Sequence, residues 1–66
     1  MELRVESKGR LPDGECQVHY VWICNTVLVV VTVFADGSRT FEFDNERRYT
    51  TEEVEAVLRV GKELTA

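Results

Sequence analysis

The chain has 66 residues, of which 44% are hydrophobic and 30% charged, and its net charge is −4. A chain of this length forms at most one domain, and it buries only about 60% of the surface that the unfolded chain exposes. The acidic balance argues against nucleic-acid binding and against anionic membrane surfaces, because proteins that bind them carry basic stripes.

The N-terminal residues, MELRVESKGR, contain no apolar stretch of the kind that secretory signal peptides carry. The longest mostly apolar run, 18–34, is interrupted by polar residues and is rich in β-branched residues. This composition favours strands over a membrane span. We therefore expect a cytoplasmic protein that does not associate with a membrane.

Residues 11–15, LPDGE, predict the first hairpin turn, because proline, aspartate and glycine suit successive turn positions. A three-residue loop here pairs residue 11 with residue 15. Counting back along both strands places Val5 opposite Val21. The same count places Leu3 opposite Ile23.

The two cysteines, Cys16 and Cys24, both fall on the predicted second strand. Eight residues of extended chain separate their Cα atoms by roughly 26 Å, whereas a disulfide needs about 7 Å or less. We therefore expect reduced thiols that serve as small core residues. His19 is the only histidine, and strand positions 16 and 19 point to opposite faces. The sequence accordingly predicts no metal site and no cofactor.

The dipeptide Asn25-Thr26 predicts a two-residue turn in the second hairpin, although asparagine followed by glycine is the stronger signal. This turn places Ile23 opposite Leu28. It also places Val21 opposite Val30.

The segment Ala35-Asp36-Gly37-Ser38 predicts the third hairpin turn and leaves two registers open. A three-residue loop with a bulge pairs Phe34 with Ser38 and places Phe41 on the face of Val29 and Val31. A two-residue turn places Phe41 on the opposite face, because a shift of one residue exchanges the two faces.

The C-terminal segment predicts an amphipathic helix over about 51–64. Thr50 and Glu53 have the spacing of a capping box, in which each side chain accepts a hydrogen bond from the other residue's backbone. Gly61 lies on the apolar stripe, which indicates close approach of the helix to the sheet. The stripe consists of Val54, Val57, Leu58, Gly61 and Leu64.

The predicted fold is α+β, with a four-stranded antiparallel β-meander and one C-terminal helix on one face of the sheet. The whole chain, 1–66, forms a single domain, with strands over about 2–8, 16–24, 27–35 and 38–44. We favour the bulged third loop, because it places Phe41, Phe43, Tyr20 and Trp22 beneath the helix. The other face then keeps an apolar surface, which comprises Leu3, Val5, His19, Val21, Ile23, Leu28, Val30 and Phe34.

Three arrangements can cover that second face. A second copy can pack sheet to sheet, the sheet can curl into a small barrel, or an unlike protein can bind. The continuous valine run favours a second copy or an unlike partner over the barrel, because strands covered on both faces lack alternation of apolar and polar residues. We therefore expect a homo-oligomer, most simply a dimer.

The predicted function is a non-catalytic protein–protein interaction module that acts as an inhibitor or adaptor, as small acidic chains of phages sometimes do. The chain lacks a glycine-rich phosphate loop, a nucleophile elbow and a clustered catalytic set, so we expect no enzyme. Arg47 and Arg48 can provide a polar anchor for a partner.

Two alternatives remain beside this function. The first is a designed domain without natural activity, because the turns and the capping box agree with design rules. The second is a single-stranded nucleic-acid binder that uses sheet aromatics, although its basic groove is not evident in the sequence.

Overall fold

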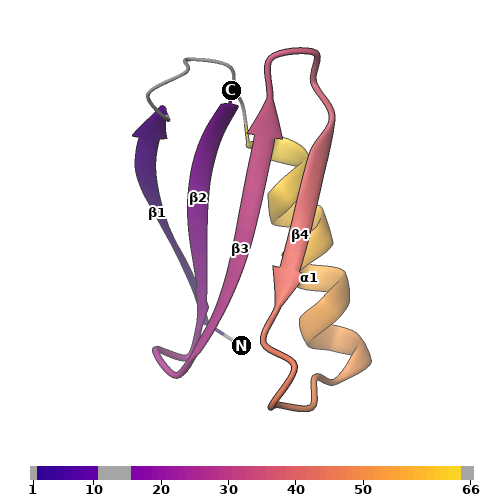
Figure 1. Ribbon diagram of the computed structural model, residues 1–66. Coiled ribbons are helices and arrows are strands. Elements are labelled where there is room, and N and C mark those ends of the chain that lie inside the picture. Colours follow the sequence, from indigo (N-terminus) through magenta and orange to yellow (C-terminus); the bar gives the residue numbers. More distant parts are fainter. Residues whose placement is uncertain (1, 11–15, 65–66) are drawn as a thin grey trace.

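The computed structural model describes residues 2–10 and 16–64, and it confirms the α+β fold with a β-meander and a C-terminal helix. The four strands form one antiparallel sheet in the order β1-β2-β3-β4, and α1 lies behind the sheet in Figure 1. Because β1 and β4 are separate edges of an open sheet, the barrel arrangement is wrong. The elements are β1 (Leu3–Arg10), β2 (Cys16–Ile23), β3 (Val27–Phe34), β4 (Arg39–Phe43) and α1 (Thr51–Glu63).

The first hairpin has the predicted register near its open end. Val5 lies opposite Val21, and Leu3 lies opposite Ile23. The register then shifts by one residue between Ser7 and Gly9, which the uniform count did not foresee. The predicted turn over 11–15 lies outside the described residues.

The second hairpin differs from its prediction by one residue. Ile23 lies opposite Val27, so the connection is a three-residue loop, 24–26. Cys24 and Asn25 take left-handed conformations, with φ of 52° and 62°. Asparagine adopts this region readily, whereas a cysteine there is unusual. The slip exchanges the two faces of β3 relative to β2.

The third hairpin adopts the predicted bulged loop. The Phe34 N–H donates to the Ser38 carbonyl at 2.8 Å, and Val31 lies opposite Phe41. Gly37 has φ of 93°, which the absence of a side chain makes accessible. Phe41 therefore joins the face of Val29 and Val31, and both residues lie in the core.

The core lies between the sheet and α1. Residues directly opposite one another in an antiparallel pair project to the same face of the sheet. Val21 and Ile23 therefore project toward the helix, together with the β1 residues opposite them and the odd-numbered residues of β3. Tyr20 and Trp22 belong to the opposite face, so their predicted place beneath the helix is wrong. Six core side chains are at most 1% exposed, namely Val21, Ile23, Val29, Val31, Val33 and Val57.

Side-chain hydrogen bonds stabilise both ends of the helix. At its start the predicted capping box is present, with the Glu53 N–H donating to the Thr50 hydroxyl at 3.1 Å and the Thr50 N–H donating to the Glu53 carboxylate at 2.8 Å. At its end the Arg39 guanidinium donates to the carbonyls of Gly61 and Leu64. These bonds place a cation at the negative end of the helix dipole.

Gly61 permits the close approach that its position on the apolar stripe predicted. A Cβ atom built at this residue would overlap the ring of Phe41. The helix backbone therefore lies directly against a core aromatic ring of β4.

Candidate binding surfaces

The predicted association surface does not form one face of the sheet. His19, Val21 and Ile23 are buried on the helix side, because the second hairpin has a different register. Leu3 and Val5 lie opposite Ile23 and Val21, so they project to the helix side as well. Of the predicted set, Leu28, Val30 and Phe34 lie on the face opposite the helix, and Phe34 is 37% exposed near the third turn.

The face opposite the helix is called the open face below, and it is turned toward the viewer in Figure 1. Its rows run across the strands, so that Trp22 lies beside Leu28 and Tyr20 lies beside Val30. Each of these side chains is partly exposed. The central apolar side chains of the open face are Val18, Tyr20, Trp22, Leu28 and Val30.

Two cations from β1 lie over the aromatic rings of the open face. The Arg4 guanidinium carbon is 5.0 Å from the ring centroid of Trp22, and the Lys8 ammonium is 5.8 Å from that of Tyr20. Both distances are within the range of cation–π attraction, which is worth about 0.5–1 kcal/mol at an exposed site. Arg4 also forms an ion pair with Glu6 at 2.9 Å. The aromatics are therefore shielded in part by their own neighbours.

Trp22 carries an unsatisfied polar atom. Its indole Nε1 is buried and has no hydrogen-bond partner among the described residues. A buried donor without a partner costs about 1–3 kcal/mol. This donor lies on the open face, whereas the sequence predicted Trp22 to lie in the core beneath the helix.

His19 and the cysteines occupy ordinary structural positions. The His19 side chain is 4% exposed, and its Nδ1 lies 2.8 Å from the Ser7 hydroxyl. Both cysteines are free, as predicted, and Cys16 is buried. Cys24 is exposed in the second turn, so its predicted place in the core is wrong. In the part of the chain that the structure describes, no three His, Cys, Asp or Glu residues cluster as metal ligands would.

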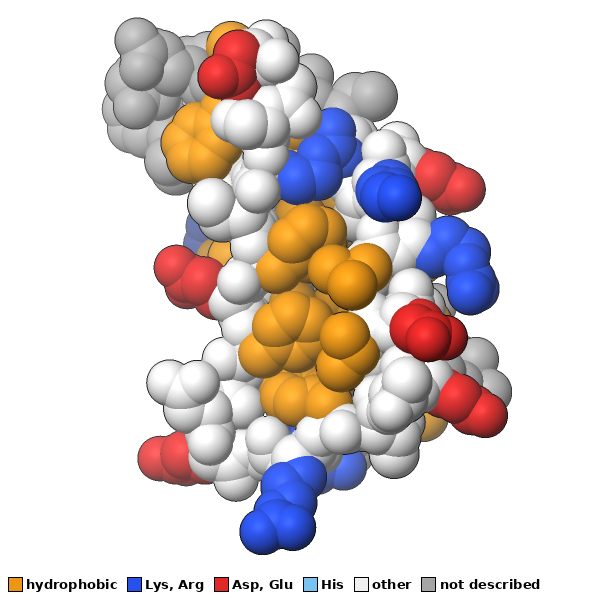
Figure 2. Space-filling view, turned by 90° about the vertical axis from the view of Figure 1, so that its right-hand side faces the viewer, with side chains coloured by type: hydrophobic (Ala, Val, Ile, Leu, Met, Phe, Trp, Pro, Cys, Tyr) orange, Lys and Arg blue, Asp and Glu red, His pale blue; other side chains and the backbone are white. Residues whose placement is uncertain are grey.

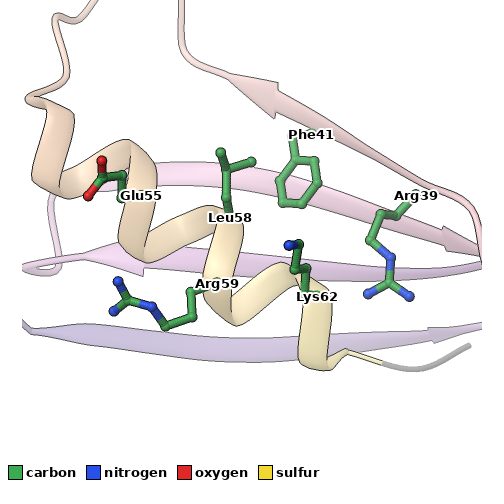
Figure 3. Close-up of a pocket in the computed structure, with 6 residues that line it drawn as sticks. All are labelled: Arg39, Phe41, Glu55, Leu58, Arg59 and Lys62. Atoms are coloured by element: carbon green, nitrogen blue, oxygen red, sulfur yellow. The ribbon is translucent and has the colours of Figure 1, made fainter.

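A second candidate surface is a groove of about 520 Å³ between β4 and α1. Figure 2 looks onto this side of the molecule and shows apolar side chains between the sheet and the helix, with cations above them. Phe41 and Leu58 supply the apolar lining, and Leu58 is 40% exposed. The charged residues of the groove are Arg39, Glu55, Arg59 and Lys62 (Figure 3).

Sequence reasoning did not identify this groove. Leu58 was assigned to the buried helix stripe, and the three cations are separated along the chain. A signal was nevertheless present, because Leu58, Arg59 and Lys62 fall within five residues of one helix and therefore lie near one another.

The predicted polar anchor, Arg47 and Arg48, lies in the loop that connects β4 with α1. Both side chains are exposed. This loop lies outside the strand rows that form the open face, so the anchor is not part of that face. Their role in binding stays a prediction.

No protein-family model matches the chain, and comparison with curated proteins and with solved structures found no significant similarity. Among the described residues, no helix is long and apolar enough to cross a membrane.

Proposed function

We propose that the chain is a non-catalytic interaction module that self-associates through its open face and acts as an inhibitor or adaptor. The observation that supports this proposal is the partly exposed cluster of Tyr20, Trp22, Leu28 and Val30 on the sheet face opposite α1. A second copy packed about 10 Å away, as in a β-sandwich, would remove this cluster from water.

The charges at the margins of the open face support a second copy as the occupant. Along β1 the face carries Arg4, Glu6 and Lys8, which together have one positive charge, whereas β4 contributes Glu42. A two-fold axis parallel to the strands places β1 of one copy over β4 of the other. Opposite charges then face each other at both margins.

The size of the open face predicts weak association. Four strands about 4.8 Å apart and roughly seven residues long give a face of roughly 450 Å² in projection. Two copies therefore bury roughly 900 Å², which is in the class of weak and transient interfaces. We expect dissociation constants in the micromolar range or above.

The test is the substitution Val30→Lys, measured by sedimentation velocity from about 10 µM to about 500 µM, the range that a weak interface requires. The wild type should shift from monomer to dimer across this range, and the variant should stay monomeric. Its circular dichroism spectrum should remain that of the wild type, because Val30 points away from the core. Ala35→Lys, in the exposed third turn, is the control and should dimerise as the wild type does.

A wild type that stays monomeric at the highest concentration would contradict the proposal. So would a Val30→Lys variant that dimerises as well as the control. The companion substitution Val29→Lys affects a fully buried neighbour and should unfold the chain, which tests the assignment of faces independently of association.

One observation favours a second function, the binding of single-stranded nucleic acid. Tyr20 and Trp22 lie on a sheet face with cations beside them, the arrangement on which bases stack in such proteins. The net charge of −4 opposes this function. Fluorescence anisotropy of a labelled single-stranded oligonucleotide at low salt decides between the two, since absence of binding there removes the alternative.

A further inference from the structure

The outer edge of β4 is a second surface, separate from the open face. The hydrogen bond from the Phe34 N–H to the Ser38 carbonyl shows that these two residues form a hydrogen-bonded pair of the β3–β4 ladder. In an antiparallel pair, hydrogen-bonded and non-hydrogen-bonded positions alternate, so Thr40 and Glu42 bond to β3. The backbone groups of the intervening residues, Arg39, Phe41 and Phe43, therefore point away from β3. Because β4 is the last strand of the sheet, these groups form an edge to which another strand can pair.

The same residues bring their side chains to the groove. Arg39 and Phe41 line it from β4, and Leu58 lines it from α1 (Figure 3). Its volume of about 520 Å³ is large enough for a few side chains. A strand that pairs with β4 would place every second side chain on the groove side, directly opposite Arg39, Phe41 and Phe43.

The charge around the groove selects the partner. Arg39, Arg59 and Lys62 oppose the single acid Glu55, so the groove carries a charge of about +2 on a chain of net charge −4. A second copy fits this edge poorly, because two-fold pairing of β4 with β4 would bring two cationic rims together. An apolar side chain over Phe41 and Leu58, flanked by carboxylates, complements the lining.

We propose that the β4 edge and its groove bind an extended acidic segment of a partner protein, which adds to the sheet as a fifth strand. Main-chain hydrogen bonds to the β4 edge supply affinity, and an apolar residue between two acidic ones supplies specificity. The five residues of β4 limit the pairing to a short segment. This surface is distinct from the open face and can act in the monomer or the dimer.

The probe is a fluorescein-labelled peptide, Glu-Thr-Leu-Thr-Glu with blocked ends, whose leucine and two glutamates fall on one side. Titration into the isotope-labelled full chain should shift the amide resonances of Phe41 and Phe43 and those around Leu58. A peptide N-methylated at the leucine amide should bind at least about tenfold more weakly, because it loses a hydrogen bond to the β4 edge. A peptide with lysines in place of the glutamates should bind more weakly by a similar factor.

A pair of matched protein variants tests the cationic rim. The double variant Arg59→Glu with Lys62→Glu should weaken peptide binding by about tenfold or more, since two favourable charges become repulsive. Arg47→Glu with Arg48→Glu makes the same change in net charge outside the groove and should alter binding by less than about twofold. Circular dichroism of both variants verifies that they are folded, and the peptide series gives a test that changes no residue of the protein.

Four outcomes would overturn the proposal. They are equal binding of the N-methylated peptide, equal binding of the lysine peptide, resonance shifts confined to the open face around Leu28 and Val30, and no shifts at about 1 mM peptide, the weakest affinity that a specific contact of this kind would give. A parallel titration with decanoate identifies the groove as a site for small amphiphiles if decanoate shifts Phe41 and the peptide does not.

Discussion

The two faces of the sheet are made from the same strands but are stabilised in different ways. On the helix face, aliphatic side chains are packed to near-zero exposure beneath α1. On the open face, aromatic rings lie partly exposed under cations from β1. The valine run of β3 serves both faces, with Val29, Val31 and Val33 in the core and Leu28 and Val30 outside. The lack of alternation between apolar and polar residues in β3 thus reflects apolar neighbours on both faces of the sheet rather than on one.

The helix does not cover its own face evenly. In Figure 1, α1 lies behind the β3–β4 side of the sheet, away from β1. Val5 pairs with buried Val21, yet it is 37% exposed at the far edge. The core therefore lies between α1 and the strands β2, β3 and β4, and β1 contributes less to it.

The largest expected effect comes from truncating one apolar residue on each face. Ile23→Ala removes a side chain that is 1% exposed and should lower the free energy of unfolding by about 2–5 kcal/mol. Leu28→Ala, on the open face, should cost roughly 1 kcal/mol in the monomer, because part of its surface is already in contact with water. Urea denaturation at low protein concentration measures both.

Equal losses at the two positions would contradict the division into a packed and an open face. The unfolding transition of Ile23→Ala should begin at the lowest urea concentrations, because a core of this size rarely supplies more than about 3–5 kcal/mol. Repeating the Leu28→Ala measurement at high concentration adds the contribution of association, which should appear only there.

The attachment of α1 to the sheet gives the next largest effect. Arg39→Gln removes the charged donor from the carbonyls of Gly61 and Leu64 and should destabilise the fold by about 1–2 kcal/mol. Arg59→Gln, on the exposed side of the same helix, should stay within about 0.5 kcal/mol of the wild type. Thermal denaturation of both variants tests this, and similar midpoints for the two would show that Arg39 does not anchor the helix.

The helix could be predicted because its signal is local, whereas the register of the first hairpin was predicted correctly only near its open end. Thr50 and Glu53 specify the start of α1 within four residues. The segment around Gly37 predicted a third turn but not its form, and the bulged loop was favoured because it placed Phe41 and Phe43 beneath the helix. The second turn carried no such signal, since its left-handed positions are occupied by Cys24 and Asn25 rather than glycine. Propensity favoured a two-residue turn there, and tertiary packing selected the longer loop.

That one-residue error had consequences for the predicted site. It moved Val21 and Ile23 from the expected association surface into the core, and it moved Tyr20 and Trp22 out of the core. The existence of an apolar second face followed from composition and a single helix, so it could be predicted. The residues on that face depended on a register that no local pattern determined. The groove beside β4 depended on the packing of Gly61 against Phe41, which brings its lining together only in three dimensions.

The smallest expected effect concerns the turn that fixes the correct third register. The hydrogen bonds that the Asp36 carboxylate accepts from the Ser38 hydroxyl at 2.6 Å and the Ser38 N–H at 2.9 Å lower the pKa of Asp36. Because the folded-state pKa is depressed, the carboxylate stabilises the fold above its unfolded pKa of about 3.9, and this contribution is lost as pH falls through the folded pKa. Ser38→Ala removes the stronger of the two causes, so the Asp36 pKa should rise toward its ordinary value. A carbon-detected NMR titration of the Asp36 carboxyl between about pH 2 and pH 6, which spans the unfolded pKa, measures the shift. An unchanged midpoint would contradict the hydrogen bond from the Ser38 hydroxyl to the Asp36 carboxylate.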